Sequence, residues 1–138
     1  MKPILGVDLG EARTGIALSD DLRMLAHPLE TIVNASVDKV AQRVQKIVSE
    51  KQVDCVVVGL PRQMNGVLGP AAQHAQRFVE RLRSLLSCEV VTWDERLSTV
   101  AAERALREAG RKTRETRGIR DQVAAQIILQ SYLDRLNA

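Results

Sequence analysis

Aromatic residues are nearly absent from this sequence and make up only 2% of it. We therefore expect an aliphatic core, and few rings are available to stack on nucleic-acid bases. Cys55 and Cys88 are isolated and lack C-x-x-C spacing, which favours buried thiols in a reducing compartment over metal ligation. No apolar run approaches the ~20 residues of a membrane helix, and an acid comes too early for a signal peptide. These absences favour a cytoplasmic protein.

The composition is that of an ordinary globular domain. Apolar residues make up 45% of the 138 residues and charged residues 27%. A chain of this length can bury a substantial core. The net charge of +3 and the isoelectric point near 9.2 hint at an anionic partner without identifying it. The sequence shows no internal repeat and no boundary, so we expect a single domain over residues 1–138.

Apolar runs and helical spacing alternate along the chain. Apolar runs predict strands at 3–9, 14–19, 28–33, 53–60 and 88–93, with Pro28 at the first position of its strand. Helical spacing predicts helices that begin at Ser36, at Pro70, at Ser98 or Thr99, and near Asp121. We expect an α/β fold whose five-stranded mixed sheet has its first three strands antiparallel and helices on both faces.

Three acidic positions fall at the ends of these expected elements. Asp8 lies near the end of the apolar run "ILGVDLG", Asp94 and Glu95 follow the last strand, and Asp121 opens the last helix. Ligands of α/β sheets bind outside the carboxyl ends of strands, where these acids could converge if the first and last strands are neighbours. Clustered carboxylates need protons or cations, and hard ions such as Mg²⁺ prefer oxygen ligands. Two such ions can clamp the attacking and leaving oxygens of a phosphoryl transfer.

Each acid also has a purely structural explanation. Asp8 could end a strand or pair with Arg13, and Arg96 could neutralise Asp94 and Glu95 in solvent. Asp121 could simply cap its helix, as aspartate does well. Strand alternation places Asp94 and Glu95 on opposite faces, so we do not expect both to be ligands of one site.

Basic residues gather just before Asp121. The segment 110–120 holds five Lys or Arg and one Glu, a local balance of 5 − 1 = +4. We interpret it as a flexible clamp on a phosphate backbone, with a solvated loop as the alternative. The loop "GLPRQMNGVLG" offers a second contact through its glycines and the helix start at Pro70, or is simply structural. The residues expected to contact nucleic acid are Arg13, Arg62, Asn65, Arg96, Arg111, Lys112, Arg114, Arg117 and Arg120.

Five segments in order resemble the motifs of one family. They are "GVDLGEARTGIALSD", "PLETI", "VVGLPRQMNGVLGPAA", "DERLST" and "DQVAAQIILQSYL". The sequence is similar in these motifs to the YqgF (RuvX) family of the ribonuclease H superfamily. Its members are described as RuvC-like Holliday junction resolvases and as nucleases that process pre-16S rRNA.

The resemblance implies a metal-dependent nuclease with a ribonuclease H-like fold. Asp8, Glu95 and Asp121 correspond to the three metal-binding, catalytic carboxylates, and the cofactor would be Mg²⁺ or Mn²⁺, with two ions expected. The implied substrate is structured or single-stranded RNA, such as the ends of pre-16S rRNA in ribosomal precursor particles, or branched DNA. A resolvase would be a homodimer, whereas an RNA-trimming enzyme could be a monomer.

Two other functions compete with a nuclease. The segment "GVDLGEARTGIAL" also resembles the phosphate loop of ATP-binding proteins of the actin and sugar-kinase type, but these need two lobes and this chain makes one. A non-catalytic nucleic-acid-binding factor is the second alternative. Three unused carboxylates would weaken its binding to phosphates, which argues against it.

Overall fold

The computed structural model describes residues 1–33, 36–61, 69–97 and 117–138, with residues 117–120 as backbone only. The strands are β1 (Ile4–Leu9), β2 (Arg13–Ser19), β3 (Ala26–Val33), β4 (Cys55–Leu60) and β5 (Glu89–Asp94). The helices are α1 (Val37–Lys51), α2 (Pro70–Leu85), the short 3₁₀ helix η1 (Glu95–Leu97) and α4 (Arg117–Leu136). The helix expected from Ser98 or Thr99 lies outside the described residues.

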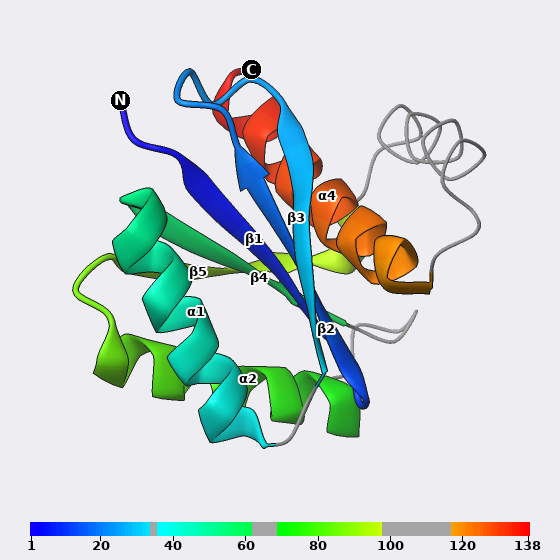
Figure 1. Cartoon of the computed structure of the whole chain (residues 1–138). Coiled ribbons are helices and arrows are strands. Elements are labelled where there is room, and N and C mark those ends of the chain that lie inside the picture. The colour runs from blue at the N-terminus through cyan, green and yellow to red at the C-terminus, as the bar shows by residue number, and fades with distance from the viewer. Residues whose placement is uncertain (34–35, 62–68, 98–116) are drawn as a thin grey trace.

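The five strands form one mixed sheet in the order β3-β2-β1-β4-β5. β1 pairs antiparallel with β2, and β2 with β3, whereas β1–β4 and β4–β5 are parallel pairs. Figure 1 shows α1 and α2 on one face of the sheet and α4 on the other. The predicted mixed sheet with three antiparallel strands and helices on both faces is confirmed.

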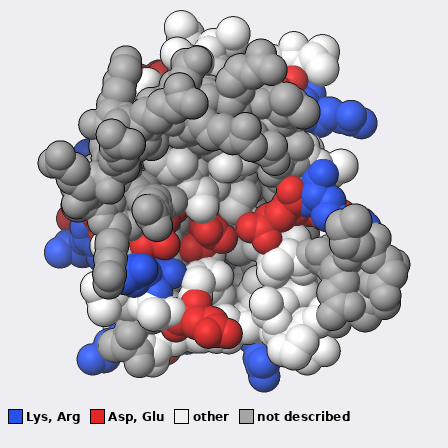
Figure 2. Space-filling view, turned by 90° about the vertical axis from the view of Figure 1, so that its right-hand side faces the viewer, with Lys and Arg blue, Asp and Glu red and all other residues white. Residues whose placement is uncertain are grey.

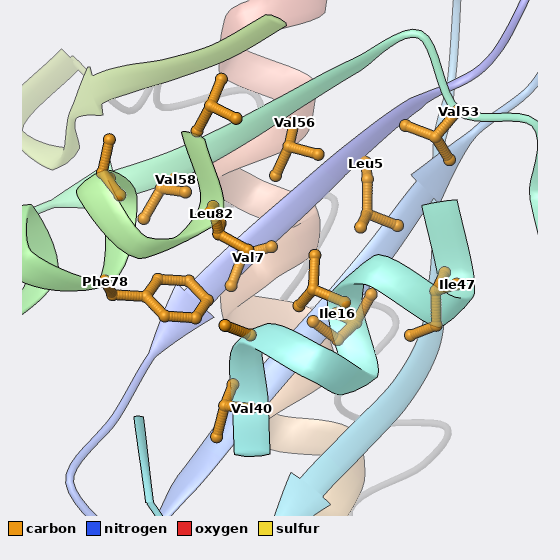
Figure 3. Packing of buried hydrophobic residues seen from close by; sticks show 14 residues of the cluster. Leu5, Val7, Ile16, Val40, Ile47, Val53, Val56, Val58, Phe78 and Leu82 are labelled. Atoms are coloured by element: carbon orange, nitrogen blue, oxygen red, sulfur yellow. The ribbon is translucent and has the colours of Figure 1, made fainter. Parts of the chain in front are cut away.

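A buried aliphatic core fills the space between the sheet and the α1–α2 layer. Leu5 and Val7 of β1, Val44 of α1 and Phe78 of α2 are all fully buried there. Figure 3 shows Phe78 as the one ring among branched aliphatic side chains. A second cluster joins Ile4 and Val57 of the sheet to Ala125, Ile128 and Leu129 of α4. Because the central strands contact apolar layers on both sides, their sequences are continuous apolar runs.

Two helices begin where local sequence signals predict. Ser36 caps α1, with its hydroxyl accepting a 3.1 Å hydrogen bond from the Lys39 amide, and α2 begins at Pro70 as predicted. The prediction that Asp121 opens the last helix is wrong, because α4 begins at Arg117, one turn earlier. Arginine is a good helix former, so the helix continues beyond its apolar stripe.

The start of β3 also differs from the prediction. The strand begins at Ala26 rather than Pro28, and Pro28 lies inside it, opposite Ala17. The pairing shifts register between Ile16 and Ala17 at this point. β3 is an edge strand, and an edge strand with an irregular register tolerates a proline inside it.

Candidate active site

Asp8 lies on the α4 face of the central strand, near its carboxyl end. Leu5 and Val7 point into the α1–α2 core, whereas Ile4 and Gly6 lie against α4. Strand alternation therefore directs Asp8 toward α4 as well. It is half-buried and lies directly opposite Gly15 of β2. The apolar strand holds this carboxyl group in place beneath the N-terminal part of α4.

Asp94 and Glu95 have separate partners. Asp94 ends β5 and accepts hydrogen bonds from Arg96, at 2.8 Å from Nη2 and 2.9 Å from the backbone amide. Glu95 begins η1, and its carboxyl group shares a hydrogen bond with that of Asp8. Arg96 therefore neutralises Asp94, as the structural explanation expected. Glu95 instead contacts Asp8.

The shared hydrogen bond places a proton between two acids. Burial, followed by the charge of Asp8 and the hydrogen bond to it, raises the pKa of Glu95 to about 7. Burial and the nearby charge of Asp121 raise the pKa of Asp8, whereas its hydrogen bond with Glu95 lowers it. These directions describe a protonated Glu95 that donates to an ionised Asp8.

Asp121 lies on α4, near enough to Asp8 for its charge to raise the pKa of Asp8. Its carboxylate accepts a hydrogen bond from Arg13, with 2.9 Å between Nε and Oδ2. The side chains of Arg13 and Asp121 are 42% and 27% exposed. Arg13, which the sequence offered as a partner for Asp8, therefore pairs with Asp121 instead.

Two glycines bring these elements together. A Cβ atom at Gly15 would overlap the main-chain carbonyl of Asp121, so only glycine lets α4 lie this close to β2. A Cβ atom at Gly59 would overlap the Ile128 side chain and lie 3.2 Å from Oε1 of Glu95. Sequence reasoning missed both roles. The available signal was a glycine inside a buried strand, which often marks a close approach of backbone or ligand.

The three acidic residues fit a divalent cation in part. Asp8 and Glu95 offer oxygen ligands, which hard cations prefer, and a cation would replace the shared proton. Within the described residues, no three His, Cys, Asp or Glu side chains are grouped so that they could hold one metal ion. The Arg13 ion pair holds the third carboxylate.

Acidic side chains lie together in a band on one face of the molecule. Figure 2 shows Asp and Glu side chains in a band across the middle of the face seen from the right of Figure 1, with Lys and Arg beside them. That side carries the carboxyl end of β1 and the first turns of α4 (Figure 1). An acidic surface repels nucleic acid unless cations or basic side chains intervene.

Five of the residues predicted to contact nucleic acid lie outside the described residues: Arg62, Asn65, Arg111, Lys112 and Arg114. Arg117 and Arg120 belong to the first turn of α4 by their backbone, and not to a loop before it. Arg13 and Arg96 are described, and each pairs with an aspartate beside the site.

Comparison with known families identifies the chain. The family model for RuvX, described as Holliday junction resolvase, matches residues 2–135. The chain belongs to the RuvX family. It is therefore a member of a nuclease family, which favours a nuclease over the ATP-binding alternative.

Curated RuvX relatives align over almost their whole length. A protein of Bacillus cytotoxicus is 46% identical over 133 residues, which cover 95% of this chain and 97% of the relative. One of Geobacillus kaustophilus is 48% identical over 132 residues, covering 94% and 96%. Both carry the provisional name pre-16S rRNA nuclease.

Solved structures of resolvases share the fold. RuvC of Thermus thermophilus, in complex with a Holliday junction substrate, aligns with a TM-score of 0.65 at 17% identity over 100% of this chain and 97% of that one. The fowlpox virus resolvase, in complex with Holliday junction DNA, gives 0.61 at 12% identity over 99% of each chain. At these identities the likeness concerns the fold alone, and it confirms the predicted ribonuclease H-like fold.

Proposed function

We propose that this RuvX protein is a divalent-metal-dependent nuclease whose active site is formed by Asp8, Glu95 and Asp121. The observation that carries the proposal is the half-buried pair of Asp8 and Glu95, whose carboxyl groups share a proton beside a third acid. Perturbed carboxyl groups in such a cluster are typical of active sites. The structural neighbours and the family description support a reaction at phosphodiester bonds.

Each part of the chain has a defined task in this reaction. When bound, two Mg²⁺ or Mn²⁺ ions would supply positive charge beside the attacking and leaving oxygens of the phosphodiester. Asp8 and Glu95 would hold them from β1 and η1, and Asp121 from α4. The rigid sheet fixes Asp8, and Gly15 and Gly59 allow Asp121 and Glu95 to approach it. Positioning and charge stabilisation then provide most of the rate.

The favoured substrate is the precursor of 16S rRNA, at the ends that are removed during ribosome biogenesis. The names of relatives that are 46% and 48% identical support this choice. The family description supports a Holliday junction as the alternative. Arg13 and Arg96, with Arg62, Asn65, Arg111, Lys112, Arg114, Arg117 and Arg120, would contact the phosphate backbone of either.

The proposed function also implies a domain organisation, a location and an oligomeric state. Residues 1–138 would form a single nuclease domain that acts in the cytoplasm on ribosomal precursor particles, as a monomer or homodimer. None of the described helices is long and apolar enough to cross a membrane.

A cleavage assay with matched variants tests the proposal. Purified protein with Mg²⁺ or Mn²⁺ is offered a labelled pre-16S rRNA fragment, single-stranded RNA and a four-way DNA junction in parallel. We expect metal-dependent cutting of the RNA precursor, lost in Asp8→Asn and Glu95→Gln. Asp54→Asn is the control and should cut like wild type, because it removes an exposed carboxylate that pairs with Arg23 before the amino end of β4. Equal cutting by wild type and Asp8→Asn would refute the active site.

A further inference from the structure

Arg13 is a basic side chain in contact with Asp121, the third acid of the proposed site. It is the first residue of β2, the strand that pairs Gly15 with Asp8. Its Nε atom lies 2.9 Å from Oδ2 of Asp121, on α4. The carboxylate of Asp121 is therefore already paired with a guanidinium.

We propose that Arg13 is a positioning residue that holds Asp121 in the metal-free protein and competes with a divalent cation for it. The inference rests on the proposed function, because it assigns Asp121 to the metal site. A cation that binds Asp121 would then have to displace the Arg13 guanidinium from it.

The strength of the ion pair suits such an exchange. Both side chains are partly exposed, at 42% and 27%, and ion pairs of this kind are weak in water. To release Asp121, the Arg13 side chain has to move away, and its partly exposed position at the start of β2 allows this.

The same ion pair accounts for a feature of the geometry. Within the described part of the chain, no three acidic, His or Cys side chains are grouped to hold one ion, although Asp121 raises the pKa of Asp8. Asp121 is thus near Asp8 while its carboxylate is engaged by Arg13. Removing the guanidinium would free the carboxylate and remove a positive charge that repels an incoming cation.

The test measures Mn²⁺ binding to the full chain without nucleic acid, by calorimetry and by the electron paramagnetic resonance signal of free Mn²⁺. We expect Arg13→Gln to bind Mn²⁺ roughly two- to tenfold more tightly than wild type. Arg13→Lys, which keeps the charge, should stay near wild type. A merely structural role would predict weaker binding in Arg13→Gln. Unchanged or weaker binding would overturn the inference.

Two control variants separate a local effect of Arg13 on Asp121 from a general effect of net charge. Arg81→Gln removes an arginine of similar exposure, 44%, from its ion pair with Asp38 on α1, so it reproduces the change in net charge away from the site. It should leave Mn²⁺ affinity unchanged, and a gain equal to that of Arg13→Gln would overturn the inference. In an Asp121→Asn background, Arg13→Gln should lose most of its effect, and a full effect there would also overturn it.

The outcome also distinguishes this inference from the proposed function. If wild type binds no Mn²⁺ at millimolar concentration, the metal-dependent function and the role of Arg13 are both refuted. If wild type binds Mn²⁺, Glu95→Gln does not, and Arg13→Gln matches wild type, then only the role of Arg13 is refuted.

Discussion

The carboxyl groups of Asp8 and Glu95 share one hydrogen bond, although one lies on the first strand and the other follows the last. Two ionised carboxylates could not remain so close, so one keeps its proton up to a pH near 7. In the metal site that we propose, a divalent cation would replace this proton. The stability of the protein and its affinity for the metal would then both depend on pH.

The first prediction concerns the stability of the metal-free protein. The folded-state pKa of Glu95, about 7, lies above its ordinary value of 4.5. The folded state keeps a proton that the unfolded state loses, so the stabilisation is complete below pH 4.5 and is lost as pH rises through 7. We expect the free energy of unfolding in urea to fall by about 1 to 3 kcal/mol between pH 5 and pH 8.

Asp8→Asn is the control for that prediction. Without the charge of Asp8, the pKa of Glu95 moves back toward its ordinary value, and the loss of stability at pH 8 becomes smaller. Equal pH dependence of the two proteins would contradict the shared proton.

A second prediction concerns stabilisation by Mn²⁺. An ion that binds only the folded state raises the melting temperature by mass action. Because the ion must displace the proton, the rise should be larger at pH 8 than at pH 6. Scanning calorimetry of wild type and Glu95→Gln at both pH values measures this. A rise of the same size in Glu95→Gln would show that Mn²⁺ binds elsewhere.

A third prediction concerns Gly15. A methyl group there would press on the Asp121 carbonyl, so Gly15→Ala should displace the start of α4. We expect a loss of about 1 to 3 kcal/mol of stability and weaker Mn²⁺ binding. Ala17→Gly is the matched control, on the same buried strand and the same face of the sheet. It should lose stability and keep its Mn²⁺ affinity. Equal Mn²⁺ affinity in both variants would argue against a positioning role for Gly15.

The architecture was predictable because it rests on local patterns. Buried parallel strands are continuous apolar runs, as in residues 53–60, and the helices of the α1–α2 layer carry one apolar stripe each. The strand pattern needed only the order and type of the elements. The convergence of the acids was expected only if β1 and β5 were neighbours, and this condition is wrong because β4 lies between them. The carboxyl ends of β1 and β5 nevertheless lie at the same end of the sheet, and the choice of Glu95 over Asp94 came from the family resemblance.

What sequence reasoning missed depends on contacts between distant segments. The partner of Arg13 is on α4, and the reason for Gly15 is the backbone of that helix. The ion pair is not visible in a single sequence, and a glycine inside an expected strand indicates a close approach without naming the segment that approaches. The start of α4 at Arg117 was missed for another reason, because its first turn carries no apolar stripe.

The most direct test of the active site is a crystal structure of the protein with Mn²⁺ at pH 8, using anomalous scattering to locate the ion. The expected result is an anomalous peak between the carboxyl groups of Asp8 and Glu95, about 2 Å from an oxygen of each, as for metal–oxygen bonds. A structure at millimolar Mn²⁺ without that peak, in which Asp8 and Glu95 still share their hydrogen bond, would contradict the proposed metal-dependent nuclease.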